Sequence, residues 1–227
     1  MIIVTGASRG LGRAICDRLA GQERAVLGLS RHIQPAEMPF PAMQCDVASI
    51  DDVKSVARAL RRNGAHVEAL INAAGIASMN LALTTPPETI GRIVNTNLLG
   101  TIFCCQEIAP LIIRNKAGSI INFSTIAVAL GLKGESIYAA SKAGVEGFTR
   151  AFAREMADFN VAVNCIAPGP IDTDLLRGVT SRQIVQIVSQ QIIPKQFPKE
   201  TVADIVELLL DPRSSSISGH VLHVGGV

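Results

Sequence analysis

The chain has 227 residues, a length that a single α/β domain can fill. Hydrophobic residues make up 48% of it, which is typical of globular proteins and excludes a disordered chain. Charged residues make up only 18%, which suggests that a partner covers part of the surface. The net charge of +2, without a basic block or stripe, argues against nucleic acid as a ligand.

The cysteines and histidines are not spaced as metal ligands. The five cysteines lack CxxC spacing, and the four histidines form no HExxH or HxxxH pair. We therefore predict no metal site and a reduced, cytoplasmic protein. The N-terminus has no basic segment, and no run of about 18 apolar residues is present to span a membrane.

Short apolar runs alternate with helical patterns along the whole chain. Strands are predicted at residues 2–5, 25–30, 67–72, 119–123, 161–166 and 220–224, and helices at 11–19, 50–62, 89–114, 138–158 and 201–210. The strand runs are nearly continuous rather than alternating, as a sheet buried on both faces requires. The pattern predicts an α/β fold: one doubly wound, Rossmann-type parallel sheet flanked by helices, formed by residues 1–227.

The segment 31–43 is an exception to this alternation. It contains Pro35, Pro39 and Pro41, spaced so that no helix of two turns can form. We predict an extended connection where a doubly wound fold normally places a crossover helix.

A glycine-rich turn, Thr-Gly-Ala-Ser-Arg-Gly-Leu-Gly, occupies residues 5–12 between the first predicted strand and the first predicted helix. Its glycines let the backbone approach a pyrophosphate, which would face the free N–H groups of the helix N-terminus. The predicted cofactor contacts in this turn are Gly6, Ser8, Arg9, Gly10, Leu11 and Gly12. The same residues satisfy GxSxG, so an α/β-hydrolase with Ser8 as its nucleophile is a remote alternative, since only one strand precedes it.

The only tyrosine, Tyr138, lies four residues before Lys142 in Tyr-Ala-Ala-Ser-Lys. Positions i and i+4 share a helix face, so the phenol and the ammonium should lie close together. A cation at about 5 Å, with an effective dielectric of about 20, stabilises a phenolate by roughly 3.3 kcal/mol. Lowering the phenol pKa to neutrality takes about 4 kcal/mol. The sequence thus predicts Tyr138 as an acid/base whose pKa Lys142 lowers; a solvated helix face is the alternative.

The end of the second predicted strand bears on the choice of cofactor. An NAD enzyme of this fold needs a carboxylate there for the ribose hydroxyls, but the strand ends at Ser30 and Arg31, and the next carboxylate is Glu37. A guanidinium binds a 2′-phosphate as a fork, and Arg9 can reach the same group. We therefore predict NADP(H) rather than NAD(H).

Seven motifs, in order, make essentially the whole chain similar to the short-chain dehydrogenase/reductase family. They are TGASRGLG at 5–12, CDV at 45–47, INAAG at 71–75, NLLG at 97–100, SIINFST at 119–125, YAASK at 138–142 and PGPIDT at 168–173. Within the family, the chain most resembles the 3-oxoacyl-acyl-carrier-protein reductases.

The resemblance implies a role for each matching residue. Tyr138 would give a proton to the substrate carbonyl oxygen as hydride arrives from the nicotinamide, Lys142 would hold the nicotinamide ribose, and Asn97 would hold a proton-relaying water. The hydroxyl that binds the carbonyl would be Thr125, 13 residues before Tyr138, and its neighbour Ser124 is the alternative. The other implied cofactor contacts are Asp46, Val47, Asn72, Ala73, Ala74, Gly75, Pro168, Gly169, Ile171 and Thr173.

The resemblance also implies an NADP-dependent oxidoreductase that reduces a 3-oxoacyl thioester or a related ketone, as in fatty acid biosynthesis. A catalytically inactive, cofactor-binding regulatory or scaffold protein is the alternative. Of two basic positions that carrier-protein reductases use to meet their partner, Lys116 matches and Phe159 does not, so the substrate is either small or carrier-bound. The apolar segment 175–194 would set specificity.

A homotetramer is expected from the resemblance and from the low charge fraction. It would be built on the outer faces of the helices at 97–114 and 138–158. The extra apolar positions there include Phe103, Ile108, Phe148 and Phe152.

Overall fold

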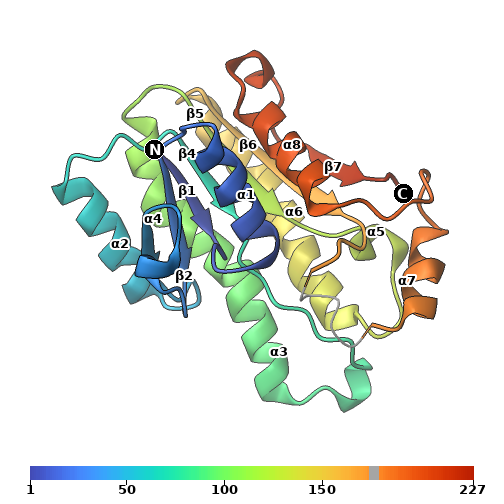
Figure 1. Cartoon of the computed structure of the whole chain (residues 1–227). Helices are drawn as coiled ribbons and strands as arrows, with labels where there is room; N and C mark the ends of the chain where they lie inside the picture. Colours follow the sequence, from blue (N-terminus) through green and yellow to red (C-terminus); the bar gives the residue numbers. More distant parts are fainter. Residues whose placement is uncertain (174–178) are drawn as a thin grey trace.

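The computed structural model describes residues 1–173 and 179–227, and one parallel β-sheet forms its centre (Figure 1). Within these residues, seven strands lie in the order β3-β2-β1-β4-β5-β6-β7. The strands are β1 (Ile2–Thr5), β2 (Val26–Ser30), β3 (Ala42–Gln44), β4 (Ala69–Asn72), β5 (Gly118–Phe123), β6 (Val161–Pro168) and β7 (Val221–Val224). Because every neighbouring pair is parallel, each connection crosses over a face of the sheet.

Helices cover both faces of the sheet (Figure 1). On one face lie α1 (Gly10–Gly21) and α8 (Lys199–Leu210), and on the other lie α2 (Ile50–Arg62), α4 (Gly100–Ile113) and α6 (Ser136–Ala157). The shorter helices are α3 (Pro87–Val94), α5 (Ala127–Leu130) and α7 (Ser181–Val188). Two layers of buried side chains therefore sandwich the sheet, and the predicted doubly wound α/β fold is confirmed.

Strands β1, β4 and β6 are buried along their whole length, as their continuous apolar runs predict. Their observed bounds differ from the predicted ones by at most two residues. The strand order reverses at β1, since β2 and β4 lie on its two sides. Open α/β sheets bind ligands at such a point, beyond the carboxyl ends of the strands.

The long helix predicted at 89–114 is helical from Pro87 to Ile113 but contains a π-helical segment at Asn95–Leu99. This stretch of 27 residues has a mean hydropathy of 1.4 and, contrary to the sequence-based expectation, could cross a membrane by length and composition. However, 56% of its apolar window is buried inside the fold. Packing of α4 against β4 and β5 therefore accounts for its apolar character.

The segment 31–43 contains no helix of two turns, as its prolines predict. It holds one 3₁₀ turn, Pro35–Glu37, and the first residues of β3. Phe40 is buried, with the guanidinium of Arg13 stacked 5.5 Å from the ring centroid. This contact fixes the extended connection against α1.

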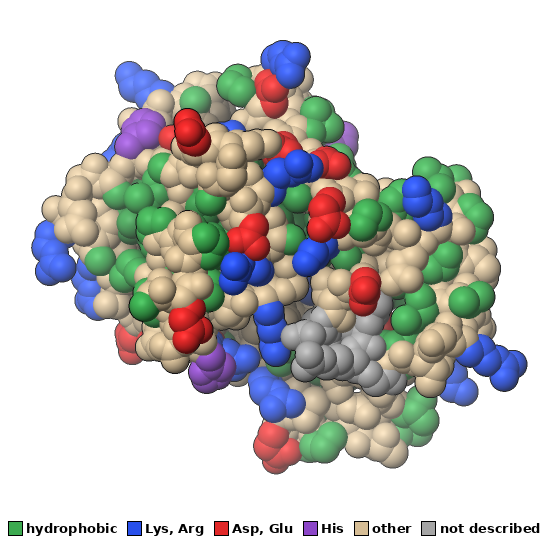
Figure 2. All heavy atoms as spheres, in the orientation of Figure 1, with side chains coloured by type: hydrophobic (Ala, Val, Ile, Leu, Met, Phe, Trp, Pro, Cys, Tyr) green, Lys and Arg blue, Asp and Glu red, His purple; other side chains and the backbone are tan. Residues whose placement is uncertain are grey.

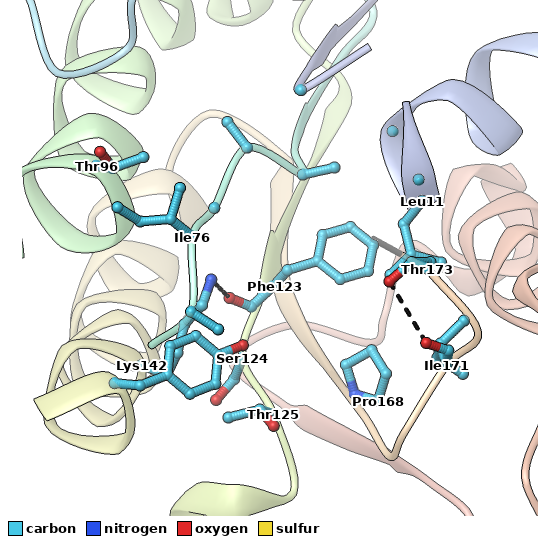
Figure 3. Close-up of a pocket in the computed structure, with 18 of the residues that line it drawn as sticks. Leu11, Ile76, Thr96, Phe123, Ser124, Thr125, Lys142, Pro168, Ile171 and Thr173 are labelled. Carbon is cyan, nitrogen blue, oxygen red and sulfur yellow. Dashed lines mark hydrogen bonds between the residues drawn. The ribbon is translucent and has the colours of Figure 1, made fainter. Parts of the chain in front are cut away.

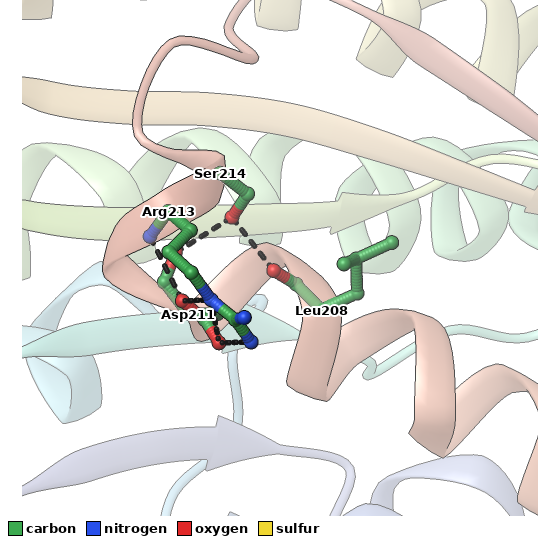
Figure 4. A network of polar contacts seen from close by, with 4 residues as sticks. All are labelled: Leu208, Asp211, Arg213 and Ser214. Carbon is green, nitrogen blue, oxygen red and sulfur yellow. Dashed lines mark hydrogen bonds and ion pairs between the residues drawn. The ribbon is translucent and has the colours of Figure 1, made fainter.

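Two hydrogen bonds from one hydroxyl group and an ion pair stabilise the turn after α8 (Figure 4). The hydroxyl of Ser214 donates to the carbonyls of Leu208 and Asp211, at 2.6 and 2.8 Å. The Arg213 guanidinium donates to both carboxylate oxygens of Asp211 and lowers the pKa of that carboxyl to about 2. These contacts satisfy carbonyls at the end of α8, where the chain turns toward β7.

Positive and negative side chains are interspersed over the face drawn in Figure 2, without a continuous basic stripe.

The four apolar residues expected on the outer faces of α4 and α6 differ in how deeply they are buried. Ile108 is 1% exposed inside the core, so its placement at a subunit interface was wrong, because its side of α4 faces the sheet. Phe152 is also buried and stacks on the partly buried Phe148, with ring centroids 5.0 Å apart. Phe103, like Phe148, is partly buried.

Candidate active site

The glycine-rich turn approaches neighbouring backbone too closely for a side chain at Gly6 or Gly12. Gly6 and Gly10 have φ of +71° and +59°, in the left-handed region that favours glycine. A Cβ at Gly12 would lie 2.4 Å from the carbonyl oxygen of Gly6. Among the described residues, no side chain caps the N-terminus of α1. Its N–H groups and positive dipole end can therefore bind an anion such as pyrophosphate.

Two hydroxyls and a guanidinium gather where β2 ends. The side-chain oxygens of Ser8 and Ser30 lie 2.9 Å apart. The Arg31 guanidinium is 4.0 Å from the carboxylate of Asp46, a pairing that the sequence did not reveal. Arg9 lines the same cavity. These hydroxyl and guanidinium donors can bind a phosphate, since a guanidinium in contact with one carboxylate keeps further N–H donors.

Tyr138 and Lys142 lie one turn apart on α6, and both are buried. The side chain of Thr125, which follows β5, lies close enough to the Tyr138 hydroxyl to lower its pKa. Lys142 Nζ donates to the carbonyl of Phe123 at 2.8 Å, the contact drawn in Figure 3. The end of β5 thus contacts both side chains of the predicted pair.

Burial moves both pKa values away from those of the free side chains. It lowers the pKa of Lys142 from 10.5 to about 8. It raises the pKa of Tyr138, and the negative charge of Glu135 raises it further, while the Thr125 hydrogen bond lowers it. The protein alone therefore does not lower the Tyr138 pKa as the spacing predicted, because Lys142 is directed at the Phe123 carbonyl.

The neighbouring hydroxyls of Ser124 and Thr125 have different partners. Ser124 Oγ donates to the buried carboxylate of Glu146 at 2.7 Å, and Arg150 binds the other oxygen of that carboxylate at 3.2 Å. Thr125 instead contacts the Tyr138 hydroxyl. Of the two candidates for the carbonyl-binding hydroxyl, Thr125 is the one beside the phenol.

Asn97 is fully buried in the π-helical segment and holds the chain after β4. Its side-chain oxygen accepts from the N–H of Ile76 at 2.8 Å, and its amide donates to the Ile76 carbonyl at 2.9 Å. The amide also donates to Ser141 Oγ, which donates to the Tyr138 carbonyl. Asn97 therefore links the backbone at Ile76 to α6, the helix that carries Tyr138.

All these groups surround one cavity of about 880 Å³ at the carboxyl ends of the strands (Figure 3). Every predicted cofactor contact lines it except Asn72, which is buried and donates instead to Asn122 and Cys105. Of the predicted catalytic residues, only Asn97 is not on its wall. Segment 168–173 returns to the glycine-rich turn, where a Cβ at Gly10 would lie 3.8 Å from Thr173 Cβ.

The sequence-based reasoning gave no role to several residues that line this cavity, among them Ile76 and Met79, which follow β4, and Glu135, which precedes α6. Ile187 of the predicted specificity segment lies on α7 and also lines the cavity. Of these, Glu135 had a signal in the sequence, since it stands three residues before the only tyrosine. The first part of the predicted specificity segment, residues 175–178, lies outside the described residues.

Comparison with known proteins decides the family. The sequence profile described as short chain dehydrogenase matches residues 1–184. The chain belongs to the short chain dehydrogenase family. It is thus an oxidoreductase by family, and this family uses nicotinamide cofactors.

Individual members of the short chain dehydrogenase family match over nearly the whole chain. The 3-oxoacyl-acyl-carrier-protein reductase FabG of Staphylococcus epidermidis is 33% identical over 99% of this chain and 96% of its own. The solved structure of the Thermoplasma acidophilum aldohexose dehydrogenase superposes with a TM-score of 0.89 at 31% identity, covering 99% and 92% of the two chains. The structure of ElxO with NADP bound superposes with a TM-score of 0.88 at 26% identity, covering 98% and 96%.

Proposed function

We propose that this short chain dehydrogenase uses NADPH to reduce the carbonyl group of a 3-oxoacyl thioester or a related ketone. The observation that carries the proposal is the placement of Tyr138 beside Thr125 in the cavity that also contains the hydroxyl and guanidinium groups of Ser8, Ser30 and Arg31. The 33% identity to a 3-oxoacyl-acyl-carrier-protein reductase supports the substrate class.

The residues fit a nicotinamide dinucleotide. Gly6 and Gly12 let the glycine-rich turn pack tightly against neighbouring backbone, because a Cβ at either position would lie within 3 Å of backbone atoms. Its N–H groups would bind the pyrophosphate, and Asp46 and Val47 would contact the adenine. Ser30 and Arg31 would bind a 2′-phosphate, since β2 ends without the carboxylate that would repel it. NADP bound to ElxO supports this choice.

When bound, the nicotinamide supplies the hydride. Thr125 donates a hydrogen bond to the substrate carbonyl oxygen and orients it, and Tyr138 transfers its phenolic proton to that oxygen. Lys142 holds the nicotinamide ribose, and Asn97 fixes the turn at Ile76 beside it. Such positioned proton transfer contributes about 10²–10⁴-fold to a rate.

The remaining expectations are part of the same proposal. The enzyme is cytoplasmic, forms a homotetramer, and takes small or carrier-bound substrates. Lys116 and Phe159 are both exposed and precede the first paired residues of β5 and β6, at the end of the sheet opposite to the cavity. Neither a hydrolase nor an inactive scaffold is favoured, because Ser8 contacts a hydroxyl and Tyr138 lies beside the Thr125 side chain in the cavity.

The test is a panel of ketones and 3-oxoacyl thioesters with NADPH and NADH in parallel. We expect NADPH oxidation with the thioesters and a loss of about 100-fold or more in kcat/KM for Tyr138→Phe. Turnover that survives in Tyr138→Phe would refute the assigned acid. An inactive wild type that still binds NADPH would identify the scaffold alternative, and ester cleavage would identify the hydrolase.

A further inference from the structure

Glu135 places an acidic group at the reacting end of the cavity. It stands at the N-cap of α6, three residues before Tyr138, and lines the same cavity. Its negative charge raises the pKa of Tyr138, which indicates that the carboxylate lies near the phenol. The proposed mechanism gives this carboxylate no role.

The protein provides the Glu135 carboxylate with little stabilisation. Within residues 1–173 and 179–227, no side chain or N–H forms a hydrogen bond or ion pair with it, although the residue is half-buried. The cavity wall on this side is apolar, with Met79, Leu132 and Ile187. Burial accordingly raises the pKa of Glu135. A half-buried carboxylate without a donor is costly, and a ligand with a donor would relieve that cost.

A second cavity, of about 380 Å³, adjoins this end of the site. It shares Met79, Leu132 and Ile187 with the main cavity, so the two are neighbours along the same wall. Its remaining wall includes Lys133 and three amide side chains, those of Gln183 and Gln186 on α7 and of Gln190 just after it. Amide side chains over apolar ones suit a chain that carries amides of its own.

We propose that Glu135 and the second cavity recognise the arm of a neutral thioester through its amide N–H groups and disfavour anionic carbonyl compounds. The inference rests on the proposed function and specifies its substrate. Glu135 would accept a hydrogen bond from the amide N–H nearest the reacting carbonyl, and the arm would continue past Leu132 toward the glutamines. A free 3-oxo acid would place its carboxylate against that of Glu135.

Three substrates separate recognition of the amide N–H from repulsion of a negative charge. The acetoacetyl thioester of N-acetylcysteamine carries the amide N–H, an alkyl thioester of equal length lacks it, and acetoacetate carries the negative charge. With wild-type enzyme and NADPH, we expect kcat/KM to be about 10-fold or more higher for the amide thioester than for the alkyl thioester. Acetoacetate should be the poorest substrate.

Two variants then assign these preferences to Glu135. In Glu135→Leu, the preference for the amide thioester should fall to about 1. In Glu135→Gln, acetoacetate should improve relative to the alkyl thioester by about 10–100-fold, as expected for two charges about 6 Å apart at an effective dielectric of about 20. The control is Glu155→Gln, which removes an exposed charge from the same helix outside both cavities and should change neither ratio.

The outcomes separate the inference from the function on which it rests. Thioester reduction with ratios that do not change in the two Glu135 variants overturns the inference and leaves the proposed function intact. A wild type that reduces none of the substrates overturns both. Should the variants fold poorly, the wild-type comparison of the two thioesters decides, because equal kcat/KM values would refute recognition of the N–H.

Discussion

Lys142→Met should stabilise this protein at neutral pH while removing its proposed activity. Burial lowers the pKa of Lys142 from 10.5 to about 8, so Lys142 binds its proton less tightly in the folded protein than in the unfolded chain. Below pH 8 the lysine is protonated in both states, and this difference costs about 3 kcal/mol of folding free energy. Methionine fills a similar volume without a charge.

The sign of the effect should change with pH. Methionine also loses the hydrogen bond to the Phe123 carbonyl, worth about 1 kcal/mol, so the net gain below pH 8 is about 2 kcal/mol. Between pH 8 and 10.5 the unfolded chain binds more protons at Lys142 than the folded protein does, so wild-type stability rises through this range. Above pH 10.5 the lysine is neutral in both states, and the variant should be less stable by about 1 kcal/mol.

The assay is urea unfolding of both proteins at matched concentration from pH 7 to pH 10.5. The difference between variant and wild type cancels the titration of all other groups. Lys54→Met, which removes an exposed ammonium from α2, is the control and should show no change of sign. A Lys142→Met difference that is constant over this pH range, or negative at pH 7, would refute the reasoning.

Three further changes test the other parts of the site. Arg31→Asp should move the NADPH/NADH ratio of kcat/KM toward NADH by about 10–150-fold, and an unchanged ratio would contradict the phosphate assignment. Thr125→Ala should lower kcat, whereas Ser124→Ala should mainly lower the unfolding free energy, by about 1–3 kcal/mol, because a buried carboxylate oxygen loses its donor. Gly12→Ala should abolish nucleotide binding in a fluorescence titration, while Gly21→Ala, with open space around its Cβ, should bind normally.

The parts of the fold that the sequence predicted well are those in which local signals agree with the packing. The helix at 50–62 has the same bounds in the structure, because Ser49 caps its N-terminus and a strongly amphipathic pattern follows. The strands were found because both faces of the sheet are covered, which makes their apolar runs continuous. Helix α7 was missed, since its apolar and polar residues line cavities and none is buried.

The spacing of residues along the sequence does not predict which distant segments contact each other. The side of α4 that faces the sheet is fixed by packing, and this is why Ile108 was misplaced. The position of Asp46 beside Arg31 depends on how β3 follows the extended connection. Asn72 belongs to a cofactor-binding motif of the family, yet its amide donates into the interior to Asn122.

The pKa of Tyr138 depends on contacts that the i and i+4 spacing of Tyr138 and Lys142 does not reveal. The i and i+4 pattern brings Lys142 to the same helix face, but the Phe123 carbonyl takes its hydrogen bond, and burial then raises the phenol pKa. A phenol with a raised pKa keeps its proton at neutral pH, as carbonyl reduction requires, but it gives that proton up less readily than a phenol whose pKa lies near neutrality. Alcohol oxidation would instead need the phenolate, which burial and the charge of Glu135 both oppose. Burial and the charge of Glu135 thus keep Tyr138 protonated in the protein without its cofactor.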